Sequence, residues 1–113
     1  MEHPGLITFS EGHLRFDKPS VLEYSRRANT IVHELVHMWF GNLVTMKWWK
    51  DLWLKESFAD FNSFLIMQKL RESKALGFEI VDQWLTMNLE TERAYYEDSL
   101  ITTHPIEREV ENT

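Results

Sequence analysis

Apolar residues recur at helical spacing over residues 20–40 of the chain. This segment opens with Ser20-Val21-Leu22-Glu23, which has the form of a capping box: a serine caps the helix and a glutamate follows three residues later. Gly41 is a typical C-terminal stop. We therefore predict a helix over 20–40. We expect it to be buried on most of its circumference, because its second half carries Val32, Leu35, Val36, Trp39 and Phe40.

Two further helices are predicted after an irregular connection. Residues 42–53 break the helical period and carry three tryptophans, so we interpret them as a packed, mostly irregular segment. A second helix is predicted over about 54–73 and, after Gly77, a third over about 78–97. Their expected apolar sides are formed by Leu54, Phe58, Phe61, Leu65 and Leu70 in the second helix, and by Ile80, Val81, Trp84, Leu85 and Leu89 in the third.

The two ends of the chain carry little helical pattern. Residues 6–9 are β-branched and aromatic between Gly5 and Ser10, which indicates a short strand. Residues 10–19 are polar and turn-like, and the tail from Ser99 has no clear period. The predicted fold class is therefore mainly α, with a short N-terminal strand.

The sequence His33-Glu34-Leu35-Val36-His37 indicates metal chemistry. Residues four apart lie on one face of a helix, so the two imidazoles can converge on one point. Glu56 follows in the first turn of the next predicted helix, where its carboxylate also interacts favourably with the helix dipole. Two imidazoles and one carboxylate make the ligand set of a catalytic zinc site with one position left for water, and Glu34 is the general base that such a site needs.

Other interpretations of these histidines remain open. They could be solvated on a surface helix, or hydrogen-bonded within an ordinary core. The apolar neighbours argue against the first, since buried polar groups need partners and a metal supplies one. Asp60, one turn after Glu56, and Asp51, before that helix, could each accept a hydrogen bond from the far nitrogen of a ligand histidine. A solvated face or a helix cap explains either aspartate equally well.

Composition narrows the class of protein. The chain has 113 residues, of which 43% are hydrophobic, which is enough for one core. Its net charge of −6 argues against nucleic acid as a partner. The absence of cysteine excludes a thiolate zinc site and weakly favours the cytoplasm, although the compartment stays open. No apolar run approaches the length of a membrane span, and no leader-like segment precedes the first residues, so we expect no membrane segment.

At this point the residues resemble a known family. His33-Glu34-x-x-His37, followed after eighteen residues by Glu56, is similar to the zinc signature of thermolysin-like metallopeptidases. The wider strings 37–45 and 48–56 resemble the aminopeptidase N family. Met1-Glu2 is similar to the end of that family's Gly-Ala-Met-Glu-Asn exopeptidase motif, and His104-Pro105-Ile106 is similar to a downstream landmark. The likeness covers nearly the whole chain.

The resemblance implies a fold and a set of roles. The chain would be the helical part of a thermolysin-like catalytic domain, with His33, His37 and Glu56 binding one Zn²⁺ and Glu34 acting as the general base. Glu2 would bind the free α-amino group of a peptide substrate. The activity would be hydrolysis of the N-terminal peptide bond. The family's oxyanion-stabilising tyrosine lies beyond Thr113, and Tyr24, Tyr95 and Tyr96 do not match it.

Several departures from the family pattern qualify this interpretation. His3 replaces a usual asparagine, and Lys55 and Ser57 flank Glu56 where asparagine and glycine are common. We interpret residues 1–113 as one piece of a catalytic domain truncated at both ends, with a β-rich domain before it and a helical domain after it in the full family fold. In isolation we expect it to be poorly active and marginally soluble. The alternatives are a related zinc epoxide hydrolase and a catalytically silent zinc-binding relative.

Overall fold

The computed structural model describes residues 1–14, 17–107, 109 and 110. The described part is mainly helical, as predicted, and the expected N-terminal strand is one of two short strands in a hairpin. Residues 15 and 16 of the polar stretch 10–19, and residues 108 and 111–113 of the tail, lie outside the described residues. In chain order the elements are β1 (Glu2–His3), β2 (Leu6–Ile7), a 3-10 helix at Glu11–His13, α1 (Val21–Val36), a 3-10 helix at Trp49–Asp51, α2 (Leu52–Ser73) and α3 (Gln83–Asp98).

Strand β2 of the N-terminal hairpin is shorter than the strand expected at 6–9. Strands β1 and β2 pair antiparallel, with Glu2 opposite Ile7 and His3 opposite Leu6. Gly5 lies in the turn between them with a φ of +76°, a conformation that favours glycine. The sequence pattern gives no sign of β1, because two residues are too few to show an alternating pattern. The pairing fixes the backbone of Glu2.

Helix α1 begins at the predicted capping box. The Glu23 amide donates to Ser20 Oγ at 3.3 Å, and the Ser20 amide donates to Glu23 Oε2 at 2.9 Å. The helix ends at Val36, earlier than the predicted Phe40. It ends there because the carbonyl of His37 accepts the Asn42 amide at 3.0 Å, which folds the chain into a tight turn.

The expected burial of this segment is partly wrong. Val36 is buried, but Leu35 is 46% exposed and Trp39 is 61% exposed. Trp39 follows the end of α1 and belongs to the turn, where a helical face no longer determines the direction of its side chain. The buried face of this segment is therefore narrower than its apolar residues suggest.

Helix α2 packs against α1 through small side chains. Ala59, Ser63 and Met67, spaced four apart, are fully buried. The apolar side predicted for this helix is partly wrong: Phe58 and Phe61 are each about half exposed, whereas the three leucines of that side are half-buried. Small residues on the contact face let the two helices approach closely, and this close approach positions the side chains described below.

Helix α3 begins at Gln83, five residues later than predicted. Asp82 caps it, with its Oδ1 accepting the Leu85 amide at 3.0 Å. The preceding segment is not helical and buries Ile80. On the predicted apolar side of α3, Leu85 and Leu89 are exposed. The start of α3 is held instead by hydrogen bonds of the buried Gln83. Its backbone N–H donates to Gln68 Oε1 at 3.1 Å.

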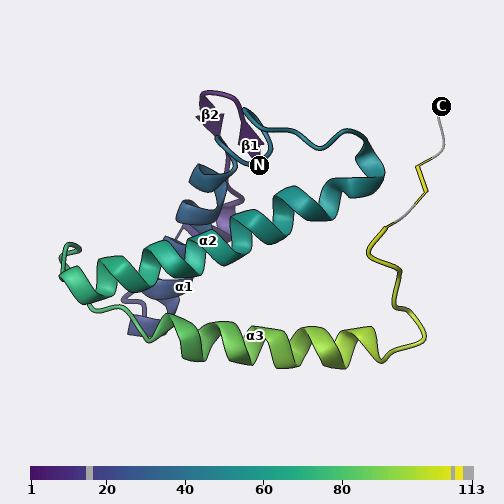
Figure 1. Cartoon of the computed structure of the whole chain (residues 1–113). Helices are drawn as coiled ribbons and strands as arrows, with labels where there is room; N and C mark the ends of the chain where they lie inside the picture. The colour runs from purple at the N-terminus through teal and green to yellow at the C-terminus, as the bar shows by residue number, and fades with distance from the viewer. Residues whose placement is uncertain (15–16, 108, 111–113) are drawn as a thin grey trace.

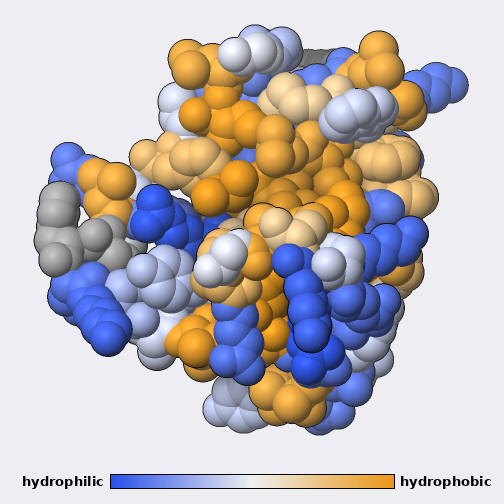
Figure 2. All heavy atoms as spheres, turned by 90° about the vertical axis from the view of Figure 1, so that its left-hand side faces the viewer, coloured by the Kyte–Doolittle hydropathy of each residue, from blue (hydrophilic) through white to orange (hydrophobic). Residues whose placement is uncertain are grey.

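The three helices form an open arrangement around a small core. In Figure 1, α2 crosses α1 and meets α3 at one end, and the tail returns from α3 towards the start of α2, where Lys50 forms an ion pair with Glu107. Figure 2 shows hydrophobic side chains gathered in a continuous area on the face that it draws. Among the described residues no helix is both long and apolar enough to cross a membrane.

Candidate metal centre

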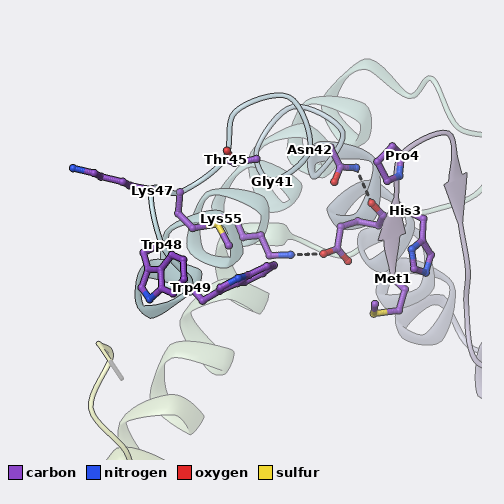
Figure 3. A pocket seen from close by; sticks show the side chains of 12 residues that line it. Met1, His3, Pro4, Gly41, Asn42, Thr45, Lys47, Trp48, Trp49 and Lys55 are labelled. Atoms are coloured by element: carbon purple, nitrogen blue, oxygen red, sulfur yellow. Dashed lines mark hydrogen bonds and ion pairs between the residues drawn. The ribbon is translucent and has the colours of Figure 1, made fainter. Parts of the chain in front are cut away.

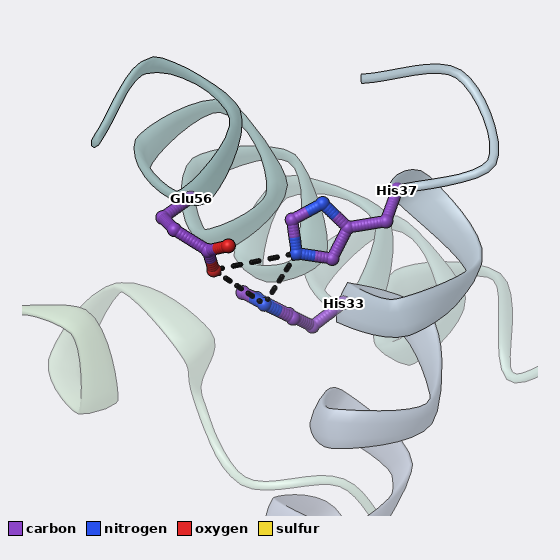
Figure 4. Close-up of side chains that lie close together, drawn as sticks. All are labelled: His33, His37 and Glu56. Carbon is purple, nitrogen blue, oxygen red and sulfur yellow. Dashed lines mark hydrogen bonds and ion pairs between the residues drawn. The ribbon is translucent and has the colours of Figure 1, made fainter. Parts of the chain in front are cut away.

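Two imidazoles meet at the C-terminal end of α1. His33 lies in the last turn of the helix and His37 is its C-cap, so the spacing of four places both rings on the same face. Their ring centroids are 4.7 Å apart with the planes at 84°, and the two Nε2 atoms lie 3.0 Å apart (Figure 4). The His37 side chain is only 2% exposed and that of His33 is 19% exposed.

Glu56 reaches the same point from α2. Its Oε2 lies 3.5 Å from His33 Nε2 and 3.3 Å from His37 Nε2. Glu56 stands in the second turn of α2 rather than the first, because the helix begins at Leu52, two residues earlier than expected. The described structure therefore brings together, from two packed helices, the three side chains that the sequence motif singled out.

Hydrogen bonds to the far nitrogens fix the orientation of both rings. His37 Nδ1 donates to the Phe40 carbonyl at 2.9 Å, and His33 Nδ1 lies 3.1 Å from Asp60 Oδ1. Because carbonyl and carboxylate oxygens only accept, each Nδ1 carries the proton and each neutral ring leaves its Nε2 unprotonated. Two lone pairs and a carboxylate oxygen then face one point, which is an arrangement that a cation stabilises.

The spacing of these atoms fits a tetrahedral zinc site. Bonds of about 2.0–2.1 Å to a tetrahedral zinc place neighbouring ligand atoms about 3.4 Å apart. The three separations measured here, 3.0, 3.3 and 3.5 Å, lie around this value. The donor set of two imidazole nitrogens and one carboxylate oxygen is also one that zinc accepts in catalytic sites. The residues present therefore fit the metal that the motif implies.

The charges around His33 favour its protonated form. The hydrogen bond to Asp60 raises the pKa of His33, against the opposing effect of burial, and the charges of Asp60, Glu56 and Glu34 raise it further. The same negative charges attract a metal cation, which competes with the proton for His33 Nε2.

Glu34 lies beside the candidate site with its side chain largely buried. Its carboxylate is 15% exposed, and its charge contributes to the raised pKa of His33. Glu34 Oε2 is buried and accepts no hydrogen bond among the described residues, although it lies 3.1 Å from the amino group of Met1. The Met1 contact is an ion pair, and a largely buried carboxylate beside the candidate ligands can accept a proton.

Glu2 is held by two residues from other parts of the chain. Asn42 Nδ2 donates to the Glu2 carbonyl at 2.6 Å, and the Glu2 carboxylate forms an ion pair with Lys55 (Figure 3). The hydrogen bond from Lys55 lowers the pKa of Glu2 to about 2, overcoming the opposing effect of burial. Glu2 also lines a cavity of about 450 Å³ together with Lys55, Trp48 and Trp49.

The two aspartates considered in the sequence analysis take different positions. Asp60 contacts His33, which corresponds to the hydrogen-bonding alternative rather than to a purely solvated side chain. Asp51 is the N-cap residue of α2, with no side-chain capping hydrogen bond, and among the described residues it contacts neither histidine. The sequence analysis assigned no role to Lys55 or to the Phe40 carbonyl. The departure from the family pattern at Lys55 was the only signal that pointed to this residue.

Comparison with known proteins places the chain in a family. The model of the peptidase family M1 domain matches residues 1–113. The chain is 48% identical to "Probable aminopeptidase 2" of Sulfurisphaera tokodaii and 47% identical to "Leucyl aminopeptidase" of Saccharolobus solfataricus, in each case over 97% of this chain and 13% of the relative. It is 44% identical to "Puromycin-sensitive aminopeptidase" of Caenorhabditis elegans, over 99% of this chain and 11% of the relative.

These matches agree with the resemblance inferred from the motif. They also show that the chain spans only about an eighth of the length of the curated relatives it matches. The family assignment applies to the region that carries the two histidines, Glu56 and Glu34, since the match covers all of it. The chain therefore belongs to peptidase family M1.

Proposed function

We propose that this chain forms the metal-binding part of a zinc aminopeptidase, which hydrolyses the N-terminal peptide bond of peptides. One observation carries the proposal: the Nε2 atoms of His33 and His37 and the Oε2 of Glu56 lie within 4.8 Å of one another, with both rings oriented by hydrogen bonds. The names of the relatives, all aminopeptidases, support the same class of substrate.

In this proposal His33, His37 and Glu56 hold one zinc ion. When bound, zinc supplies Lewis acidity, which polarises a carbonyl and makes water nucleophilic near neutral pH. Asp60 and the Phe40 carbonyl keep the two rings in the tautomer that binds metal, because each accepts the Nδ1 proton. The ring orientation is therefore set before the metal binds.

Glu34 moves the proton. Its carboxylate accepts a proton from the attacking water as the oxygen–carbon bond forms, and it donates that proton to the departing amine as the carbon–nitrogen bond breaks. The position of Glu34 beside the candidate ligands, where its charge helps to raise the pKa of His33, supports this role. Proton transfer by one carboxylate in both directions balances the hydrolysis without a further acid or base.

Glu2 gives the reaction its preference for the amino end. An ionised carboxylate attracts the α-ammonium group of a peptide, and the low pKa of Glu2 keeps it ionised at any physiological pH. A peptide held by its first ammonium group presents only its first carbonyl to the metal. An internal peptide bond has no ammonium group next to its carbonyl, so Glu2 does not hold it in register with the metal.

The test uses the full-length protein. We expect about one zinc per chain by elemental analysis, and hydrolysis of aminoacyl 4-nitroanilides but not of their N-acetylated counterparts. Replacement Glu34→Ala should retain the metal and lower kcat by at least about a hundredfold. A matched control is Glu92→Ala, an exposed glutamate on α3, which should change neither quantity. Stoichiometric zinc without turnover on any reporter would instead favour the catalytically silent relative.

A further inference from the structure

Lys55 lies between two carboxylates that have separate tasks in the proposed reaction. Its Nζ forms the ion pair with Glu2 Oε1 and lies 3.5 Å from Glu56 Oε1. The other oxygen of Glu56 faces the two histidines. One ammonium group therefore connects the residue proposed to bind the substrate amine with a residue proposed to bind the metal. Its side chain is only 13% exposed.

The position of the Lys55 side chain is restricted by the turn after α1. A Cβ added to Gly41 would lie 3.1 Å from Lys55 Cδ and 3.2 Å from His37 Nδ1. Gly41 also has a φ of +133°, a conformation that favours glycine. The backbone of this turn therefore fits closely between Lys55 and the His37 ring, so the lysine stem is held on one side by the same turn that orients a metal ligand.

Glu2 needs such a partner to keep a fixed position. Its side chain is 18% exposed, and a carboxylate this far from solvent requires a cation or several hydrogen bonds. Asn42 fixes the Glu2 carbonyl, whereas Lys55 fixes the carboxylate. A carboxylate has about four lone-pair sites, so one ammonium group leaves room for a second. The substrate amine can therefore bind Glu2 while Lys55 stays in place.

We propose that Lys55 is a positioning residue for the substrate amine: it holds the Glu2 carboxylate at a fixed distance from Glu56, and so keeps the amine in register with the metal-bound end of the substrate. This proposal rests on the proposed function. The geometry matters because one α-carbon separates the ammonium group of a peptide from its first carbonyl, so the anchor and the metal must keep a constant separation. Among the described residues, Lys55 is the only one that forms an ion pair with both Glu2 and Glu56.

The test measures binding rather than turnover. Two ligands are compared on the zinc-loaded full-length protein by calorimetry: leucine hydroxamate, and 4-methylpentanohydroxamic acid, which is the same molecule without the amine. Both bind metal through the hydroxamate, so their affinity ratio isolates the contribution of the amine. In the wild-type protein we expect the amine-bearing ligand to bind more tightly.

Replacement Lys55→Met keeps most of the stem and removes the charge. We expect it to weaken leucine hydroxamate about tenfold and to change the affinity of the des-amino ligand less than about twofold. For aminoacyl substrates KM should rise by a similar factor while kcat changes much less, and Lys55→Arg should restore part of the affinity ratio. The matched control is Lys47→Met, which removes an exposed lysine that lines the same cavity and points away from Lys55 in Figure 3. It should leave the ratio unchanged.

Each contrary outcome has a definite meaning. Tighter binding of leucine hydroxamate to Lys55→Met would show that Lys55 competes with the substrate amine, and equal weakening of both ligands would show a general structural role. Either result overturns the proposal, as does an unchanged ratio. If Lys55→Met does not fold or loses zinc, Lys55→Gln is measured in its place with the same expected results. Equal affinity of the wild-type protein for the two ligands refutes the amine anchor of the proposed function itself, before any Lys55 variant is considered.

Discussion

Asp60 Oδ1 lies 3.1 Å from His33 Nδ1. Asp60 stands on α2, one helical turn after Glu56. A single face of α2 thus carries both a candidate metal ligand and the carboxylate that orients another candidate ligand. The Asp60 side chain is 68% exposed, so the contact is not the result of burial. It follows from the close packing of α1 and α2 at the small residues Ala59 and Ser63.

We expect Asp60→Asn to lower zinc affinity by about 10–100-fold, because a neutral amide replaces the carboxylate that accepts the His33 Nδ1 proton and makes the ring a stronger ligand. The measurement is competition with a metal-binding dye on the full-length protein. Asp51→Asn is the matched control, since Asp51 is also near α2 but contacts neither histidine. Equal losses in the two variants would contradict a specific role for Asp60.

Zinc should stabilise the protein against heat. The three candidate ligand atoms lie within 3.5 Å of one another in the folded chain, so zinc binding lowers the free energy of the folded state relative to the unfolded state. We expect the thermal midpoint to fall on chelation and to recover when zinc is restored. In Glu56→Gln the zinc-dependent shift should be largely lost, whereas Glu92→Gln on α3 should keep it. A full shift in Glu56→Gln would remove Glu56 from the ligand set.

The sequence predicted the meeting of His33, His37 and Glu56 better than it predicted the packing around them. His33 and His37 lie four apart on one helix, and the helical period alone brings their rings together. The place of Glu56 near the start of the next helix predicted that its carboxylate would reach the same point. These relations are local or depend on one helix pair, so a motif can encode them.

Contacts between distant segments could not be predicted in the same way. The ion pair of Glu2 with Lys55 joins residues 53 positions apart, and no periodicity relates them. The buried side of α2 is formed by Ala59, Ser63 and Met67 rather than by its phenylalanines. At Ala59 and Ser63 the close approach to α1 requires small side chains. The start of α3 is set by the cap at Asp82, which the apolar pattern beginning at Phe78 obscured.

Gly41→Ala should destabilise both the turn and the site. The added Cβ would lie 3.1 Å from Lys55 Cδ and 3.2 Å from His37 Nδ1, and the φ of +133° is strained for alanine. We expect a loss of about 1–3 kcal/mol in stability and weaker zinc binding, measured by thermal unfolding and by dye competition. Gly77→Ala is the control, because an added Cβ there has no neighbour within 4 Å. It should be neutral or stabilising by up to about 1 kcal/mol. Similar effects at the two glycines would show that the close approach at Gly41 is unimportant.

Gln83→Ala should release the start of α3 from the other two helices. The Gln83 side chain is buried, donates to the Val81 carbonyl at 2.9 Å and accepts from Asn29 Nδ2 at 3.4 Å. Its removal leaves buried polar groups without partners, at a cost of about 1–3 kcal/mol. The effect should appear as faster hydrogen exchange over 80–90, with little change in zinc content. Asn88→Ala, at an exposed position on α3, should not change the exchange.

The ion pair of Glu2 with Lys55 should make a contribution to stability that persists to low pH. The pKa of Glu2 is lowered from 4.5 to about 2, chiefly by the hydrogen bond from Lys55, so the folded protein keeps this carboxylate ionised where the unfolded chain begins to bind a proton. The contribution is therefore fully present above about pH 4.5 and is lost as the pH falls towards 2. We expect the thermal midpoint of Glu2→Gln to lie below that of the wild-type protein by a constant amount between about pH 8 and pH 5.

Below about pH 4.5 that difference should narrow steadily. The same variant should lower kcat/KM for aminoacyl substrates by one factor across neutral pH and leave the position of the acid limb unmoved, since Glu2 does not titrate there. Differential scanning measurements and pH–rate profiles on the full-length protein provide the two readouts, with Glu92→Gln as the control for loss of a carboxylate. A stability difference that closes between about pH 6 and pH 5 would mean that Glu2 titrates well above its assigned range, and that Lys55 does not hold it ionised.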